Sequence, residues 1–221
     1  MIEGKIKKKH QVLTGENLTA AQRRTYIIVI GLLSTLLPFS VDLVLPAFPR
    51  IGQEFAASNS SVQFTFTGVT IGFAIGQLIA GPLADAIGRR RPMLILTALH
   101  LAGSLMCYLS PSIDLFFWSR ILQGIGGAGA AVLMGAVVRD LYTGGPMLTM
   151  MGRISLISTL APIVAPIIGS QLITFLPWRG IFIFLIVYAG LVWLATYRFL
   201  IETLHTDDRR SSGVKTVMAR F

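Results

Sequence analysis

Two charged residues, Asp42 and Arg120, lie inside long apolar stretches of the chain. Ionisable groups within a membrane span are costly, and they usually line a cavity or pair with one another. We therefore expect these two side chains to form an ion pair or to share a polar cavity within the membrane. The alternative is that Asp42 lies at the membrane surface and that its carboxylate reaches water.

Other reactive residue types are few and widely spaced. The histidines (His10, His100 and His205) lie far apart without metal-ligand spacing, so we predict no metal site. Cys107 is the single cysteine, and we expect it to be a buried packing residue and His100 to be a hydrogen-bonded one. Ser104 and His100 share one apolar segment but lack the glycine-rich motif of an intramembrane serine protease. The sequence therefore does not predict an enzyme.

The composition indicates which elements must position these residues. Of 221 residues, 53% are hydrophobic and 13% are charged, and the mean hydropathy is +0.71. A soluble domain would have about 25% charged residues, whereas a membrane-spanning helix needs about 20 apolar ones. Six spans fill the chain and leave no soluble catalytic or nucleic-acid-binding domain. The predicted spans are Thr25–Leu45, Val62–Leu83, Met93–Ser110, Leu115–Val138, Leu148–Leu176 and Ile181–Leu200.

Basic residues predict the orientation of these spans. Arg50 and Arg179 fall on one side, whereas sixteen lysines and arginines fall on the other. Because cytoplasmic loops are rich in Lys and Arg, we expect both termini in the cytoplasm. The net charge of +9 then reflects topology rather than nucleic-acid binding, and Asp42 and Arg120 both lie in the outer half of the membrane. The sixteen residues are Lys5, Lys7, Lys8, Lys9, Arg23, Arg24, Arg89, Arg90, Arg91, Arg139, Arg153, Arg198, Arg209, Arg210, Lys215 and Arg220.

Small residues and prolines predict how the helices pack. Glycines recur every four residues from Gly68 to Gly76 in the second span, and residues 124–131 of the fourth span are all small except Ile125. Such strips allow two helices to approach closely. Pro162 and Pro166 lie four residues apart in the fifth span, where each removes a backbone donor and bends the helix. We therefore expect a shaped fifth helix beside a cavity.

The connection between the second and third spans carries a recognisable motif. It reads Gly81-Pro-Leu-Ala-Asp85-Ala-Ile-Gly88-Arg89-Arg90-Arg91-Pro92. This resembles the signature cytoplasmic loop of the major facilitator superfamily, in which Gly88 permits a tight reversal. Ala86 departs from the family pattern, which usually has a basic residue after the aspartate.

Further stretches resemble the same family in the expected order. Arg120-Ile-Leu-Gln123-Gly124 is similar to the fourth-helix motif associated in the family with proton coupling. The run around Pro162, Pro166 and Gly169 is similar to the antiporter motif of exporters, with Ser170 where a second glycine is common. Three more stretches resemble signatures of the Bcr/CflA-type drug–proton antiporters. They are Asp42-Leu-Val-Leu-Pro46-Ala-Phe-Pro49, Arg139-Asp140 and Trp178-Arg179.

The resemblance implies proton-driven export of small amphipathic drugs across the plasma membrane, with the proton gradient in place of a cofactor. It implies that Asp42 is the protonatable site at the substrate cavity. By the same resemblance, Arg120 would tune the protonation of Asp42, and Gln123 would add a polar contact. The loop residues would form a cytoplasmic latch, and the fifth-helix residues would shape that helix and limit leakage. The latch residues are Gly81, Asp85, Gly88, Arg89, Arg90 and Asp140, and the fifth-helix residues are Pro162, Pro166 and Gly169.

Members of this family have two six-helix halves, each made of two inverted three-helix repeats. We expect an all-α membrane protein that resembles the first half: a cytoplasmic tail (1–24), one six-helix bundle (25–200) and a cytoplasmic tail resembling the start of the central linker (201–221). We favour a truncated or split gene product that needs a second half. The alternatives are a half-size protein that dimerises and an inactive membrane protein. The expected partners are drug-like substrates, protons and the lipid bilayer, and no nucleic acid.

Overall fold

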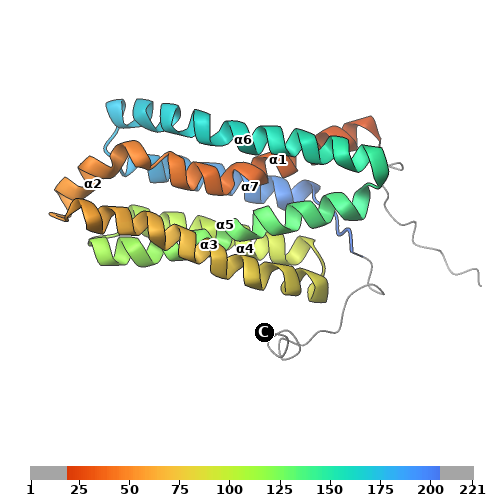
Figure 1. The fold of residues 1–221 in the computed structure, drawn as a ribbon, viewed down its shortest axis with the longest axis horizontal. Helices are drawn as coiled ribbons and strands as arrows, with labels where there is room; N and C mark the ends of the chain where they lie inside the picture. The colour runs from red at the N-terminus through yellow and green to blue at the C-terminus, as the bar shows by residue number, and fades with distance from the viewer. Residues whose placement is uncertain (1–18, 205–221) are drawn as a thin grey trace, which may run out of the picture.

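The computed structural model describes residues 19–204, which are all-helical apart from short connections (Figure 1). Six of the helical segments are long and apolar enough to cross a membrane, as predicted. The tail lysines, His10, His205 and the basic residues beyond 204 lie outside the described residues. The elements are α1 (Ala20–Asp42), η1 (Leu45–Ala47), α2 (Phe48–Glu54), α3 (Asn59–Ile87), α4 (Arg90–Leu109), α5 (Ile113–Leu141), α6 (Gly144–Phe175) and α7 (Gly180–Phe199).

All six spanning helices begin earlier than the predicted spans, and polar capping residues start three of them, α1, α3 and α5. Thr19 forms a capping box with Gln22 at the start of α1. The hydroxyls of Ser58 and Ser112 accept a backbone N–H in the first turns of α3 and α5. A side-chain oxygen at this position satisfies one of the helix's free amides. The helices therefore extend through polar turns that hydropathy assigns to loops.

Two predicted connections are wrong in detail. Residues 46–61 lie between the first two predicted spans, but the stretch with Pro46 and Pro49 forms η1 and α2, with each proline in the first turn of its helix. Proline fits there because the first amides of a helix have no intrahelical acceptor. The predicted spans left residues 84–92 as a connection, yet only Gly88 and Arg89 separate α3 from α4. Gly88 has φ +98°, a conformation that favours glycine.

The six spans form two layers (Figure 1). In one layer, α5 packs against α3 and α4; in the other, α1 packs against α6 and α7. The α1–α5 and α4–α7 contacts join the layers. The first helix of each three-helix half of the chain therefore packs with the second and third helices of the other half. This exchange agrees with the expected pair of inverted repeats.

Glycines permit the closest approach within the α3–α4–α5 layer, as predicted. A Cβ atom on Gly72 or Gly76 of α3 would collide with backbone atoms of Ile121 or Ile125 on α5. Gly126 of α5 lies equally close to the backbone of α4. The small residues therefore bring helix backbones into contact, which strengthens van der Waals packing where lipid provides no hydrophobic driving force.

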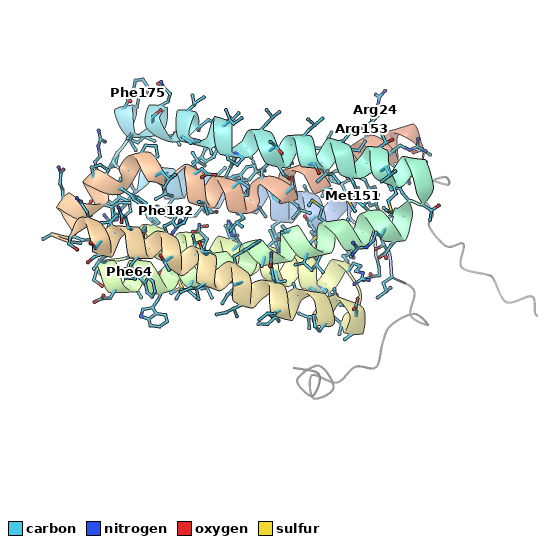
Figure 2. The ribbon with its side chains drawn as sticks, in the orientation of Figure 1. Arg24, Phe64, Met151, Arg153, Phe175 and Phe182 are labelled. Atoms are coloured by element: carbon cyan, nitrogen blue, oxygen red, sulfur yellow. The ribbon has the colours of Figure 1, made fainter. Side chains whose placement is uncertain are left out.

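The outward-facing side chains are apolar, as a bilayer requires. Phe64 on α3 and Phe175 on α6 are 62% and 81% exposed and project away from the bundle (Figure 2). Phe182 on α7 instead lies fully buried between the layers. Exposed leucines and isoleucines extend along α3 and α6, which are the least buried spans. A soluble monomer seldom exposes so much contiguous apolar surface.

Candidate functional site

Arg120 lies at the centre of a buried polar network. The α5 helix places its side chain between the layers, where it has no exposed surface. Its Nη1 atom donates to the Ser40 carbonyl of α1 at 2.7 Å and to Oε1 of Gln123 at 2.6 Å. The guanidinium of Arg120 therefore ties α1 to α5 at the point where the two layers meet.

Gln123, His100 and Ser104 extend this network to α4. Nε2 of Gln123 donates to Oγ of Ser104 at 2.7 Å. Nδ1 of His100 lies 2.9 Å from the Gln123 carbonyl and so must donate to it, while Nε2 lies 3.0 Å from Oγ of Ser40. His100 is thus the hydrogen-bonded packing residue that was expected. Ser40 and Ser104 were not predicted, because isolated serines in apolar helices carry no distinguishing pattern.

The expected ion pair between Asp42 and Arg120 is not formed in this structure. Among residues 19–204 the ion pairs are Arg89–Asp85, Arg89–Asp140 and Arg179–Glu54. Asp42 is the last residue of α1 and is partly exposed, two residues beyond Ser40. Nε and Nη2 of Arg120 are buried without a hydrogen-bond partner in the described part of the chain. Unsatisfied buried donors of this kind are costly, so Arg120 has donors available for a further acceptor.

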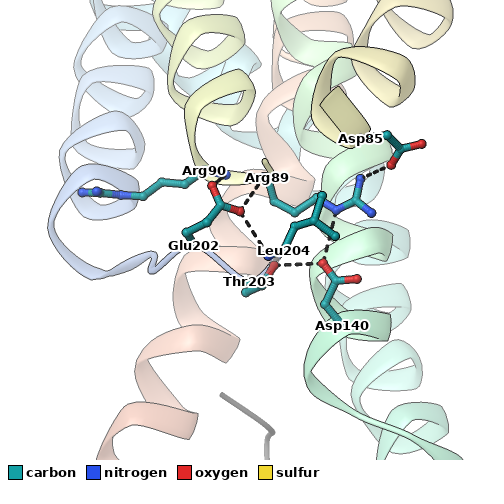
Figure 3. Close-up of polar contacts among 7 residues, drawn as sticks. All are labelled: Asp85, Arg89, Arg90, Asp140, Glu202, Thr203 and Leu204. Carbon is teal, nitrogen blue, oxygen red and sulfur yellow. Dashed lines mark hydrogen bonds and ion pairs between the residues drawn. The ribbon is translucent and has the colours of Figure 1, made fainter. Parts of the chain in front are cut away.

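A second polar cluster surrounds Arg89 at the end of the bundle where α3 meets α4 (Figure 3). Nη1 of Arg89 lies 2.5 Å from Oδ1 of Asp85 in the last turns of α3, and Nε lies 3.2 Å from Oδ2 of Asp140 in α5. Burial alone would lower the pKa of Arg89. The hydrogen bonds and charges of Asp85 and Asp140 outweigh that effect and raise the pKa. Arg89 therefore joins α3 to α5 as a permanent cation.

Glu202 and Thr203 complete this cluster, although they were expected to belong to a tail. The carboxylate of Glu202 accepts from the backbone N–H groups of Arg89 at 2.7 Å and Arg90 at 3.3 Å. The hydroxyl of Thr203 donates to Oδ2 of Asp140 at 2.9 Å. A carboxylate at a helix N-terminus is favourable, and α4 has no side-chain cap of its own. The missing cap was the only sequence signal for this contact.

The remaining predicted loop residues play different structural roles. Arg90 extends its Nη2 to the Tyr197 carbonyl of α7 at 2.7 Å rather than to an acidic side chain. Gly81 lies within α3 and faces Val132 of α5 loosely. A Cβ atom on Gly88 would collide with the carboxylate of Glu202. Gly88 is therefore favoured by its positive φ, and a side chain there would also displace the carboxylate of Glu202 from the start of α4.

The fifth-span residues lie along one helix that contacts α1. Pro162 and Pro166 are inside α6, which continues as one α-helix from Gly144 to Phe175. Gly169 is buried, and a Cβ atom there would collide with the Leu43 carbonyl, just after α1 ends. Gly169 therefore allows α6 to pack directly on the backbone next to Asp42.

Six apolar helices in two interlocked layers, with a buried cation between them, define a multi-pass helical membrane protein. Residues 30–219 match the family model of the Major Facilitator Superfamily, and the chain belongs to this family. The family and the solved structures that share its fold are transporters rather than enzymes.

Relatives cover the chain almost completely. It is 38% identical to the uncharacterized MFS-type transporter YdgK of Bacillus subtilis, over 90% of this chain and 50% of that protein. It is 36% identical to the bicyclomycin resistance protein homolog of Haemophilus influenzae, over 88% of this chain and 49% of that protein. The chain therefore spans about half the length of the curated relatives it matches.

Solved structures show the same arrangement of helices. The human organic anion transporter MFSD10 matches with a TM-score of 0.67 and 24% identity, over 90% of this chain and 53% of that one. The xylose transporter XylE from E. coli matches with a TM-score of 0.70 and 17% identity, over 81% of this chain and 48% of that one. At these identities the similarity shows the fold alone.

Proposed function

We propose that this chain forms the first six-helix bundle of a proton-driven exporter of small amphipathic drugs. Two relatives support this substrate class by their names, the bicyclomycin resistance protein homolog and, at 29% identity, the multidrug resistance protein MdtL of Salmonella paratyphi C. The structural observation that carries the proposal is the placement of Asp42. Its carboxylate lies at the end of a membrane-spanning helix, on a backbone segment that Arg120 holds from α5.

A proton on Asp42 is the coupling step of this mechanism. A carboxylate that loses water around it binds its proton more readily, whereas a nearby cation favours the charged form. Nε and Nη2 of Arg120 have no acceptor among residues 19–204, and Nη1 reaches the backbone two residues before Asp42. We infer that drug binding and Asp42 protonation compete in one cavity, and that Arg120 and Gln123 set the balance between them. The proton gradient then drives export without any cofactor.

The Arg89 cluster is the proposed cytoplasmic latch. Both termini and this cluster are assigned to the cytoplasm because basic residues gather at that end of the spans, in a plasma-membrane protein. Arg89 is held by Asp85 and Asp140, which lie on different helices, α3 and α5. Breaking and remaking this ion-pair cluster would accompany the opening and closing of the cytoplasmic side.

Transport requires a second six-helix half, which further residues of the same polypeptide, a second polypeptide or another copy of this chain would supply. The wide apolar surfaces of α3 and α6 leave room for such a partner as well as for lipid. If the chain were instead an assembly partner without transport activity, it would confer no drug resistance with either kind of partner.

Resistance in an efflux-deficient bacterial host tests the proposal. The chain would be expressed alone and together with the second half of a close relative, and growth would be measured against a panel of amphipathic drugs. We expect co-expression to raise resistance and Asp42→Asn to abolish the gain. Asp114→Asn is the matched control, because Asp114 is an exposed carboxylate in the first turn of α5. Resistance that survives Asp42→Asn would refute proton coupling at this residue.

A further inference from the structure

The end of the bundle opposite Arg89 contains a cluster around Arg179, the residue that precedes α7. Nη1 of Arg179 forms an ion pair with Oε1 of Glu54, the last residue of α2. Glu54 also accepts a hydrogen bond from Nε1 of Trp178. The guanidinium of Arg179 stacks over the Trp178 ring, 4.4 Å from its centroid.

Arg179 also binds the end of α4. Its Nε donates to the Tyr108 carbonyl at 3.1 Å, and its Nη2 donates to the Ser110 carbonyl at 2.6 Å. Carbonyls at a helix C-terminus lack intrahelical donors, and a cation there is favoured by the helix dipole. All three kinds of guanidinium nitrogen in Arg179 are therefore used, which fixes its orientation as a lysine would not.

The clusters at the two ends correspond through the inverted repeat. Arg89 connects the second and third spans and pairs with Asp140, near the end of the fourth span. Arg179 connects the fifth and sixth spans and pairs with Glu54, at the end of the first span. The two clusters therefore occupy equivalent positions in the two three-helix repeats. Each arginine thus pins the first span of the opposite repeat within its own layer.

The residues flanking α7 also hold both ends of α4. Glu202, after α7, places its carboxylate on the N-terminal amides of α4, and Arg179, before α7, places its guanidinium on the C-terminal carbonyls. Each charge has the sign that its end of the helix dipole favours. The antiparallel pair α4–α7 joins the two layers, so these contacts fasten one layer to the other.

We infer that Arg179 and Glu54 form a lock that is the inverted-repeat counterpart of the Arg89 cluster and keeps this end of the bundle closed. The lock keeps α2, the end of α4 and the start of α7 together, so that the bundle moves as one body. It involves neither Asp42 nor Arg120, and it acts whether or not the chain transports drugs.

Cys107 is a built-in reporter of this lock. It is the single cysteine of the chain and is fully buried, one residue before Tyr108, among Phe116, Trp178 and Phe182. A thiol reagent reaches it only when this end of the bundle opens. The rate at which N-ethylmaleimide labels Cys107 in the solubilised chain therefore measures local opening.

We expect Glu54→Gln and Arg179→Gln each to increase the labelling rate by about tenfold or more, because each removes a charge-assisted hydrogen bond. The double variant is expected to label at about the rate of Arg179→Gln alone, since Glu54 acts on this end of the bundle mainly through its ion pair with Arg179. Arg179→Lys should label at an intermediate rate, because lysine keeps the positive charge but lacks the planar guanidinium that donates to several acceptors at once. Circular dichroism would verify that each variant retains its helices.

Asp140→Asn is the matched control, because it weakens the corresponding ion pair at the Arg89 end. Cys107 labelling should stay within about twofold of the original rate in this variant, as expected for a distant, independent site. The inference is overturned if neither Glu54→Gln nor Arg179→Gln accelerates labelling. An equal acceleration by Asp140→Asn would also overturn it, since the bundle would then loosen as a whole.

Discussion

At the scale of single residues, Arg120 shows how this chain keeps a charge within the membrane. The guanidinium is neutralised by no carboxylate among the described residues; a backbone carbonyl and the Gln123 amide accept from it instead. The Gln123 side-chain amide in turn donates to the Ser104 hydroxyl, and His100 donates to the Gln123 carbonyl. Such a network is stable only while each member keeps its partners.

Gln123→Leu is therefore expected to lower the free energy of unfolding by about 1–3 kcal/mol. The change removes the oxygen that accepts from Arg120 and the amide that donates to the Ser104 hydroxyl. The measurement is SDS-induced unfolding of the solubilised chain, followed by circular dichroism. Gln77→Leu is the control, because Gln77 is exposed on α3 and its loss should change stability by less than about 0.5 kcal/mol. Equal effects of the two variants would contradict the network.

Glu202→Gln tests the carboxylate at the start of α4. Losing the charge while keeping the shape should weaken the interaction with the helix N-terminus by about 0.3–1 kcal/mol. Hydrogen exchange in the first turn of α4 should then become a few-fold faster. Exchange at the start of α5, which Ser112 caps, should be unchanged. A uniform change across both helices would mean that Glu202 affects the whole bundle.

The types and spacing of single residues predicted part of the site. Arg120, Gln123, Asp85, Arg89 and Asp140 were identified from motifs, and the structure brings the last three together. Their partners were missed where the contact joins distant positions in the chain. Ser40 and Glu202 have no local pattern, since only tertiary packing brings them to Arg120 and to the start of α4.

At the scale of elements, close backbone contact between α3 and α5 determines how the first layer packs. Hydropathy predicted all six spans because about 20 apolar residues in succession form a strong signal. It missed their polar first turns, because capping at Thr19 and Ser58 depends on hydrogen bonds rather than on apolarity. It also missed α2, because Pro46 and Pro49 resemble helix breakers although each starts a helical turn.

Gly72→Ala tests the contact between these two helices. Its new methyl group would collide with the Ile121 backbone, so the helices must separate, and we expect a loss of about 1–3 kcal/mol in the SDS titration. Gly152→Ala is the control in α6, because no atom lies within contact distance of the new methyl group. Replacing glycine by alanine in a helix should itself stabilise by about 0.5–1 kcal/mol. Destabilisation by both variants would contradict a specific role for the glycine strip.

At the scale of the whole molecule, the described part of the chain is one bundle fastened at both ends. Arg89 and Glu202 hold one end, and Arg179 and Glu54 hold the other. The buried network around Arg120 lies between them and joins the two layers. The chain spans about half the length of its curated relatives, so the proposed transport cycle involves this rigid bundle moving against a second one.

Proton release on drug binding tests the central claim most directly. The chain, co-purified with the second half of a close relative in weakly buffered detergent solution, would be mixed with an amphipathic drug while a pH indicator is followed. We expect the drug to release protons from the complex, Asp42→Asn to abolish the release, and Asp114→Asn to leave it unchanged. Drug binding without proton release, or release that persists in Asp42→Asn, would contradict proton-coupled export through Asp42.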